Sequence, residues 1–200
     1  ALPIFNKALQ TLLEQTLTDR RWDMTYLGMQ VLIEGLALAA FQSIRDKAGN
    51  TLAGAVNAYV MQDEARHVSF GRLALREYYP HLSDAERDER EEFAVEALYW
   101  MRDRFNQSEV WERLGLPAKT LDEIHYNSKQ MNSFRGRLFS RVVPTIKDIG
   151  LWGPRVRKAF AEMGVMDYAE INVVEQLAND GKVAEDFDRK MFVDKAVAAE

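Results

Sequence analysis

The stretch Met61-Gln62-Asp63-Glu64-Ala65-Arg66-His67 puts a carboxylate and an imidazole three residues apart, inside a long segment with helical spacing. An α-helix has about 3.6 residues per turn, so Glu64 and His67 lie on the same face of that segment. A glutamate and a histidine on one face can bind the same metal ion. The neighbouring segments decide whether this pair belongs to a metal site or to a solvated helix surface.

Two long helices are expected here, joined by a short turn. The spacing of apolar residues predicts one helix over 22–46 and another over 51–79. Asn50 is suited to cap the start of the second helix, and Pro80 to end it. Glu34 interrupts the apolar stripe of the first helix. Because the connection is only about four residues long, the two helices are expected to form an antiparallel hairpin.

This hairpin brings Glu34 and Glu64 to one height. With the turn at residues 48 and 49, each glutamate lies about 15 residues away from it, or ~22 Å along its helix. His67 lies one turn further on. Two glutamates and a histidine in an apolar seam are costly without a partner, and a cation would neutralise the carboxylates. Carboxylate and imidazole donors without sulfur suit iron or manganese, with zinc as a further choice.

A structural interpretation of the same residues stays open at this point. A single glutamate on a helix is usually solvated, and the spacing Glu-x-x-His is common by chance. A buried network in which Arg66 or Arg45 compensates the charge of Glu34 and Glu64 would need no metal. The metal site is favoured because Glu34 breaks an otherwise apolar face at the height of Glu64.

The rest of the chain also predicts helices. Alternation with a period of two, which is typical of strands, is absent from the sequence. The tail beyond Gly181 is charged and weakly patterned, and we expect a loosely docked arm there. Pro144 is expected to kink or restart its helix. Capping boxes are expected at Ser83 to Glu86 and Thr120 to Glu123. Further helices are predicted over 3–18, 84–106, 108–114, 121–131, 133–148, 155–163 and 168–179. The fold class is therefore an all-α helical bundle with additional C-terminal helices.

The composition limits the class of protein. The 200 residues are 47% hydrophobic and 28% charged, with a net charge of -5 and no dominant basic cluster, so a nucleic-acid partner is not expected. The longest apolar run, Leu36 to Phe41, is shorter than the ~18 residues that span a membrane, so no membrane partner is expected either. The chain has no cysteine, which excludes disulfides and thiolate ligands. These features favour a cytoplasmic protein.

The residues around Glu34 and His67 resemble half of a ferritin-like di-iron carboxylate site. The resemblance lies in Gly28-Met29-Gln30-Val31-Leu32-Ile33-Glu34-Gly35-Leu36 and in Asp63-Glu64-Ala65-Arg66-His67-Val68-Ser69-Phe70. These two sequence motifs are similar to those of ferritin-like oxidases and oxygenases of the p-aminobenzoate N-oxygenase group and, more distantly, of ribonucleotide reductase small subunits. The resemblance covers about residues 20–115. In this superfamily a Glu and a Glu-x-x-His come from each of two hairpins.

This resemblance implies Glu34, Glu64 and His67 as ligands of two iron ions, with manganese as an alternative metal. It implies that Asp63 accepts a hydrogen bond from the metal-bound His67 and so orients its imidazole. The implied activity is that of an oxidoreductase, in which dioxygen oxidises a small organic substrate by N-oxygenation, hydroxylation or desaturation, with electrons from a donor protein. Two other readings stay open: a ferritin-like protein that binds or stores metal without turnover, and a helical interaction module without metal.

Half of the implied ligand set is missing, because the sequence contains a single Asp-Glu-x-Arg-His. Weaker internal candidates are Glu96, Asp122 and His125, although Asp122 falls in an expected first helical turn, where a carboxylate more often serves the helix dipole. We expect a preceding segment to carry the missing hairpin, with internal ligands or a homodimer as alternatives. The ferritin-like hairpins with the half-site are assigned to 1–115, and a helical extension packed on the bundle to 116–200.

Overall fold

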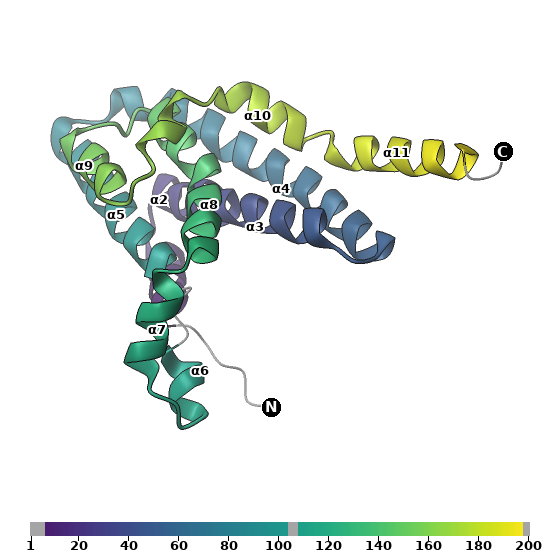
Figure 1. Ribbon diagram of the computed structural model, residues 1–200. Coiled ribbons are helices and arrows are strands. Elements are labelled where there is room, and N and C mark those ends of the chain that lie inside the picture. The colour runs from purple at the N-terminus through teal and green to yellow at the C-terminus, as the bar shows by residue number, and fades with distance from the viewer. Residues whose placement is uncertain (1–6, 104–107, 198–200) are drawn as a thin grey trace.

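All the regular secondary structure is helical in the parts of the chain that the computed structural model describes, residues 7–103 and 108–197 (Figure 1). The predicted all-α fold class is thereby confirmed. The expected helix start at residue 3 and the expected helix end at residue 106 lie outside the described residues. Side chains are described as far as residue 190.

A helical hairpin forms the middle of the molecule. Its first arm is one continuous run made of α2 (Trp22–Tyr26), the π-helical turn η1 (Leu27–Ile33) and α3 (Glu34–Lys47), and its second arm is α4 (Thr51–Tyr78). Figure 1 shows α3 and α4 side by side. The short connection forces the two arms to run antiparallel, as the sequence predicts.

The ends of α4 follow from local chemistry. At its start, the side chain of Asn50 accepts a hydrogen bond of 2.8 Å from the backbone N–H of Ala53, which satisfies one of the free amides of the first turn. At its end, Pro80 cannot continue the α-helical hydrogen bonding, and residues Tyr79–His81 form a 3-10 turn. Both boundaries agree with the sequence prediction.

One apolar core joins the N-terminal and C-terminal parts of the chain. Fully buried residues come from α1 (Lys7–Thr18), η1, α5 (Asp84–Asp103), α8 (Lys129–Asp148) and α9 (Pro154–Glu162). They include Leu12, Val31, Leu98, Val142 and Phe160. Since α8 supplies part of the same core as η1 and α5, a single core spans the two ranges divided at residue 115. That division remains an interpretation.

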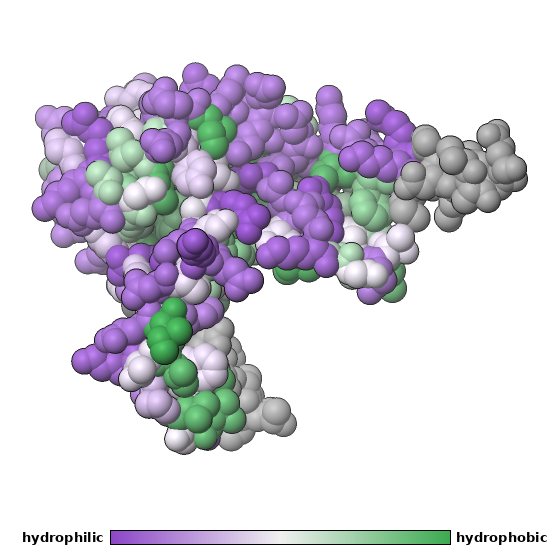
Figure 2. All heavy atoms as spheres, in the orientation of Figure 1, coloured by the Kyte–Doolittle hydropathy of each residue, from purple (hydrophilic) through white to green (hydrophobic). Residues whose placement is uncertain are grey.

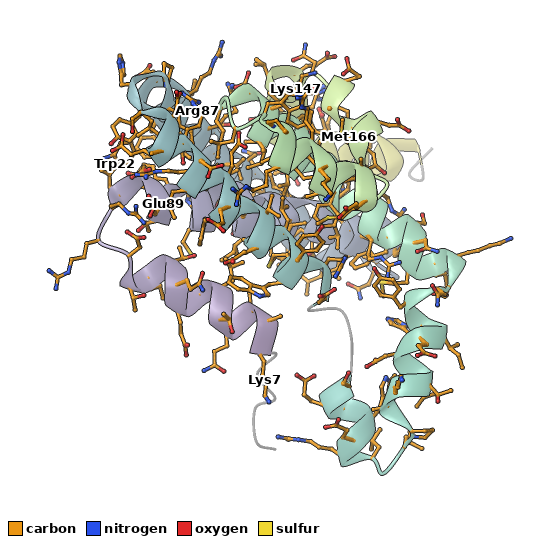
Figure 3. The ribbon with its side chains drawn as sticks, turned by 90° about the vertical axis from the view of Figure 1, so that its left-hand side faces the viewer. Lys7, Trp22, Arg87, Glu89, Lys147 and Met166 are labelled. Atoms are coloured by element: carbon orange, nitrogen blue, oxygen red, sulfur yellow. The ribbon has the colours of Figure 1, made fainter. Side chains whose placement is uncertain are left out.

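A buried ion pair fixes the start of the hairpin's first arm. Nε of Arg90, on α5, donates a 2.9 Å hydrogen bond to Asp23, on α2. The two side chains are 3% and 2% exposed. Each charge would be costly to bury alone, so the pair ties α2 to α5. Trp22 precedes Asp23 and lies at the outer edge of the molecule (Figure 3).

The C-terminal tail differs from the loosely docked arm that the sequence suggested. The chain continues through η3 (Met166–Glu170) and α10 (Val173–Asp180) into α11 (Val183–Val197), which docks on α4. The hydroxyl of Tyr59 donates a 2.6 Å hydrogen bond to Asp188, and Gln62 accepts one of 3.2 Å from the backbone N–H of Ala184. The ring of Phe187 lies against Gly54, 3.1 Å from where a Cβ would be. The expectation of a loosely docked arm is therefore corrected. The sequence could not reveal these contacts, because they join residues far apart in the chain and need no apolar periodicity in α11.

The helices between α5 and α9 correct two further details. The helix predicted over 121–131 is split into α7 (Ala118–Tyr126) and α8, because Ser128 caps α8 by accepting a 3.1 Å hydrogen bond from Met131 N–H. α7 begins after Pro117 without a side-chain cap, so the capping box predicted at Thr120 is wrong. By contrast, Ser83 and Glu86 form the predicted capping box.

A short arm extends from the bundle. Figure 1 shows α6 (Ser108–Arg113) and α7 projecting away from the other helices. Figure 2 shows hydrophobic surface in green on this arm. Its exposed apolar side chains include Leu114, Leu116 and Ile124. α8 continues through Pro144, which lies inside the helix rather than restarting it.

The run Trp22–Lys47 is long and apolar enough, by length and composition, to cross a membrane. The sequence analysis counted only uninterrupted apolar residues and found no run of sufficient length. That estimate is corrected, because the helix carries few charges between its apolar residues. In the structure 44% of its most apolar window is buried. The same run supplies Leu27, Val31 and Leu32 to the core. A helix buried in the core of a bundle is apolar because most of its surface contacts other helices.

Candidate metal centre

Three side chains of the central hairpin meet at one point. One ligand atom of each of Glu34, Glu64 and His67 lies within 4.8 Å of the other two. His67 Nδ1 is 3.3 Å from Glu64 Oε2 and 3.9 Å from Glu34 Oε1. Glu34 is the first residue of α3, and the other two lie in the middle of α4. The registry inferred from the short turn therefore brings together the residues it predicted.

The group lies at the edge of the bundle, with its carboxylates more buried than its imidazole. The side chains of Glu34 and Glu64 are 20% and 24% exposed, and that of His67 is 58% exposed. Glu34 Oε2 is buried and has no hydrogen-bond partner. An ionised oxygen in that position has lost its water without gaining a donor, which is the condition that a bound cation relieves.

The pKa of Glu34 reflects this environment. Burial raises the pKa above its usual value, the negative charge of Glu64 raises it further, and His67 opposes both effects. The carboxyl of Glu34 is thus held against ionisation by two causes, desolvation and a like charge. A cation between the carboxylates would reverse both.

The arginines do not form the alternative salt-bridge network. Arg66 pairs with Asp63 at 2.7 Å, and Arg45 pairs with Asp46 at 2.8 Å. Within the described part of the chain, His67 alone forms an ion-pair contact with Glu34 or Glu64. The negative charge of the group is therefore not compensated by a neighbouring guanidinium.

Asp63, for which the resemblance implied a role beside His67, pairs with Arg66 in the structure. Its side chain is 69% exposed and accepts its hydrogen bond from Arg66, three residues along the same helix. The structure thus brings Asp63 to Arg66 rather than to the imidazole of His67. A role for Asp63 in orienting His67 stays a prediction.

The π-helical turn η1, which ends directly before Glu34, was not visible in the sequence. Such turns are rare and often occur at functional sites. Here the backbone of α4 comes close to η1, because Gly71 has no side chain. A Cβ at Gly71 would lie 2.6 Å from Cβ of Gln30. Gly71 is the sequence signal of this close packing, and Gly28 plays the same part where η1 meets Thr16 of α1, but neither glycine reveals a wider helical turn.

The weaker internal candidates lie apart from the three residues. Glu96 is exposed on α5 and lines a cavity of about 390 Å³. Asp122 accepts hydrogen bonds from Ser108 and from Trp111 Nε1, so it joins α7 to α6. His125 lies in a separate hollow between α7 and α8, with its Nε2 buried. No group of three metal-binding side chains in the described ranges includes any of them.

A chain of aromatic contacts begins one helical turn beyond His67 on α4. Phe70 lies three residues beyond His67 on α4 and is 59% exposed. Its ring centroid is 5.7 Å from that of Tyr26, which in turn is 5.2 Å from Trp22. Trp22 also contacts Tyr78, with centroids 4.9 Å apart. A partly exposed aromatic cluster thus joins α2 to α4, starting at Phe70.

The fold and the site define a helical bundle protein with a carboxylate–imidazole group on its central hairpin. The family model described as "P-aminobenzoate N-oxygenase AurF" matches residues 40–150. The chain belongs to this family, which is a family of ferritin-like di-iron oxygenases. The matched range contains Glu64 and His67 and begins after Glu34. No curated protein and no solved structure matches the chain significantly.

The residues present fit a non-haem iron site. Two carboxylates and one imidazole are hard and intermediate donors of the kind that iron and manganese take. The unpartnered Glu34 Oε2 provides a lone pair for a metal. Di-iron sites in helical bundles use one Glu from each of two helices and a Glu-x-x-His from each of two others. The group seen here corresponds to one Glu and one Glu-x-x-His.

Proposed function

We propose that the protein is a di-iron oxygenase that uses dioxygen to oxidise a small organic substrate, with Glu34, Glu64 and His67 among the iron ligands. The observation that carries the proposal is the meeting of these three side chains, without a compensating arginine, in a chain of this family. A partly buried pair of carboxylates is costly to keep unless it serves a cation, and membership of a di-iron oxygenase family supports iron as that cation.

Each ligand has a separate task. Iron, when bound, supplies the activation of dioxygen, which no side chain of this chain can perform. Glu34 and Glu64 bring negative charge to balance the metal, and the partial burial of both keeps water from competing for it. His67 binds through a neutral imidazole nitrogen. Phe70 lies one helical turn beyond His67, and its ring contacts that of Tyr26.

The substrate we propose is an aromatic amine, oxidised at nitrogen. The family description names p-aminobenzoate N-oxygenation, and a flat ring can pack against Tyr26 and Phe70. Hydroxylation or desaturation of another small molecule are the alternative reactions. Turnover needs electrons from outside this chain, and a ferredoxin or flavoprotein would supply them.

Iron binding and product formation test the proposal together. Metal-free protein is loaded with Fe(II) without oxygen, the iron per chain is measured, and air is then admitted in the presence of a reductant and p-aminobenzoate. We expect bound iron and N-oxygenated product, both lost in Glu64→Ala. Glu77→Ala is the control, since Glu77 is exposed on the same helix and lies outside the ligand group. If wild-type protein binds no iron and Glu64→Ala changes only the stability, the proposal is wrong.

A metal-binding protein without turnover is the second candidate. The exposure of His67 favours it, because an open ligand group also suits reversible uptake of a cation. The same experiment separates the two functions. Storage predicts bound iron, and oxidation of that iron by air, without any organic product in a panel of aromatic amines.

A further inference from the structure

The position of the ligand group depends on the packing of its two helices. Among the described residues, no side chain from outside the group forms a hydrogen bond with Glu34, Glu64 or His67. The places of the three side chains are therefore set by the backbones of α3 and α4. Whatever packs behind these two helices also holds the ligands.

A small apolar cluster, separate from the main core, lies behind the ligands. Ala65 directly follows Glu64, and Val68 directly follows His67. Every buried member either lies within one helical turn of a ligand on α3 or α4, or comes from α10: Leu38, Met61, Ala65, Val68, Val173 and Leu177. In the ranges that the structure describes, α10 is thus the one element outside the hairpin that supplies buried side chains to this cluster.

α10 is fixed on its other side to α8. Pro144 has no N–H, so the carbonyl of Ser140 lacks its usual donor within the helix. Nε2 of Gln176 donates a 3.3 Å hydrogen bond to that carbonyl. One turn further along α10, Asp180 lies 2.8 Å from Nη2 of Arg141, and the two side chains are at most 10% exposed. Because this ion pair is buried, α10 cannot move along α8 without separating two charges.

We propose that α10 is a positioning element for the metal centre and that Leu177 is the residue through which it acts. The inference rests on the proposed function, because it concerns the same ligands. Leu177 lies between the two anchors Gln176 and Asp180, so its side chain transmits the fixed position of α8 to the part of α4 that carries Glu64 and His67. The coupling acts in both directions, and a bound cation should stabilise the docked position of α10.

Hydrogen exchange of the full chain tests this coupling without any substitution. Amide exchange is measured with chelator and with Mn(II), an air-stable probe for the site. We expect slower exchange in α10 when Mn(II) is bound. α9 is the internal control, because it packs mainly on α5 and η3 rather than on the hairpin, and its exchange should stay the same.

Leu177→Ala tests the residue itself. The variant should bind Mn(II) about tenfold more weakly, at the low end of what metal sites lose when the support of a ligand is removed. The EPR signal of free Mn(II), which disappears on binding, measures the affinity, and circular dichroism checks the fold. Leu177→Met keeps the side-chain volume and should bind like the wild type.

Leu82→Ala is the matched control. Leu177 and Leu82 are 5% and 9% exposed, but Leu82 belongs to the main core. Its truncation should therefore lower the stability and leave the affinity for Mn(II) unchanged. If Leu177→Ala does not fold, the exchange measurement on the wild type decides.

The outcomes separate this inference from the proposed function. Equal affinities of wild type and Leu177→Ala, or exchange in α10 that ignores Mn(II), would overturn the positioning role and leave the oxygenase intact. An equal loss of affinity in Leu82→Ala would also overturn it, because the effect would then follow stability in general. Coupling of α10 to Mn(II) in a protein that oxidises no amine supports the positioning role and contradicts the oxygenase. A wild type that binds no Mn(II) contradicts both.

Discussion

His67 Nδ1 lies 3.3 Å from Oε2 of Glu64, one helical turn back on α4, in a contact that both atoms would give up to bind one metal ion. This contact holds the imidazole beside the carboxylate of Glu64. Metal binding would replace one hydrogen bond with coordination of both residues. The ligands are therefore already close to the geometry they need, and little chain movement is required to load the site.

Glu34→Gln should stabilise the metal-free protein while weakening metal binding. Burial and the charge of Glu64 both oppose ionisation of Glu34, and the amide removes that charge without changing the shape. The expected gain in the free energy of unfolding is on the order of 1 kcal/mol, as is common when a functional site gives up strain. Urea denaturation in the presence of chelator measures it. A loss of stability without metal would contradict the unfavourable burial of this charge.

Gly71→Ala should disturb the packing of α4 against η1. The added Cβ would lie 2.6 Å from Cβ of Gln30, so one helix must move. Overpacking of this kind costs about 1–3 kcal/mol. Because η1 leads directly into Glu34, we also expect weaker binding of Mn(II). Gly49→Ala is the matched control, since nothing lies within 4 Å of its Cβ position, and it should change neither quantity.

Arg90→Met should be among the most destabilising single substitutions in the bundle. It leaves the carboxylate of Asp23 buried and unpaired, which costs about 3–5 kcal/mol. Arg155→Met removes an exposed partner of Asp88 and should cost less than about 1 kcal/mol. Thermal unfolding compares the two variants. Equal effects would show that the burial of the Asp23–Arg90 pair has no energetic consequence.

The capping box at the start of α5 predicts an acid-sensitive contribution to stability. Hydrogen bonds from the Ser83 hydroxyl and backbone N–H hold the pKa of Glu86 below its ordinary value of 4.5. A lowered folded-state pKa adds stability above the unfolded pKa, and this contribution is lost as the pH falls through the folded value. Glu86→Gln should therefore be less stable than wild type at pH 7, and the gap should close as the pH falls below 4.5 and through the lowered folded-state pKa. A gap that persists in acid would contradict the charged hydrogen bond.

The meeting of Glu34 and Glu64 could be predicted because helix geometry is fixed. A short turn and a constant rise per residue leave one registry for the hairpin, and the two glutamates stand at equal distances from that turn. The family could be recognised for the same reason, because its ligands are a Glu on one helix and a Glu-x-x-His about thirty residues later on the next. Helix starts at Asn50 and Ser83 followed from local capping chemistry.

Other features depend on contacts that no local pattern records. The docking of α11 rests on Tyr59 and Asp188, which are 129 residues apart. The preference of Asp63 for Arg66 over His67 is a competition between two neighbours that the spacing alone does not decide. Local sequence also failed to separate α7 from α8. Thr120 and Ser128 are both residue types that cap helices well, and in the structure only Ser128 acts as a cap.

The π-helical turn before Glu34 sets the angle between two parts of one helix. A π-turn closes its hydrogen bonds one residue later than an α-turn, so η1 holds an extra residue. Deleting one residue from Leu27–Ile33 would let the run continue as α-helix and would rotate Trp22 and Tyr26 by about 100° relative to Glu34. Trp22 and Tyr26 would then turn away from Tyr78 and Phe70, the residues of α4 that they contact. The inserted residue therefore lets α2 keep its aromatic contacts with α4 while Glu34 stays beside Glu64 and His67.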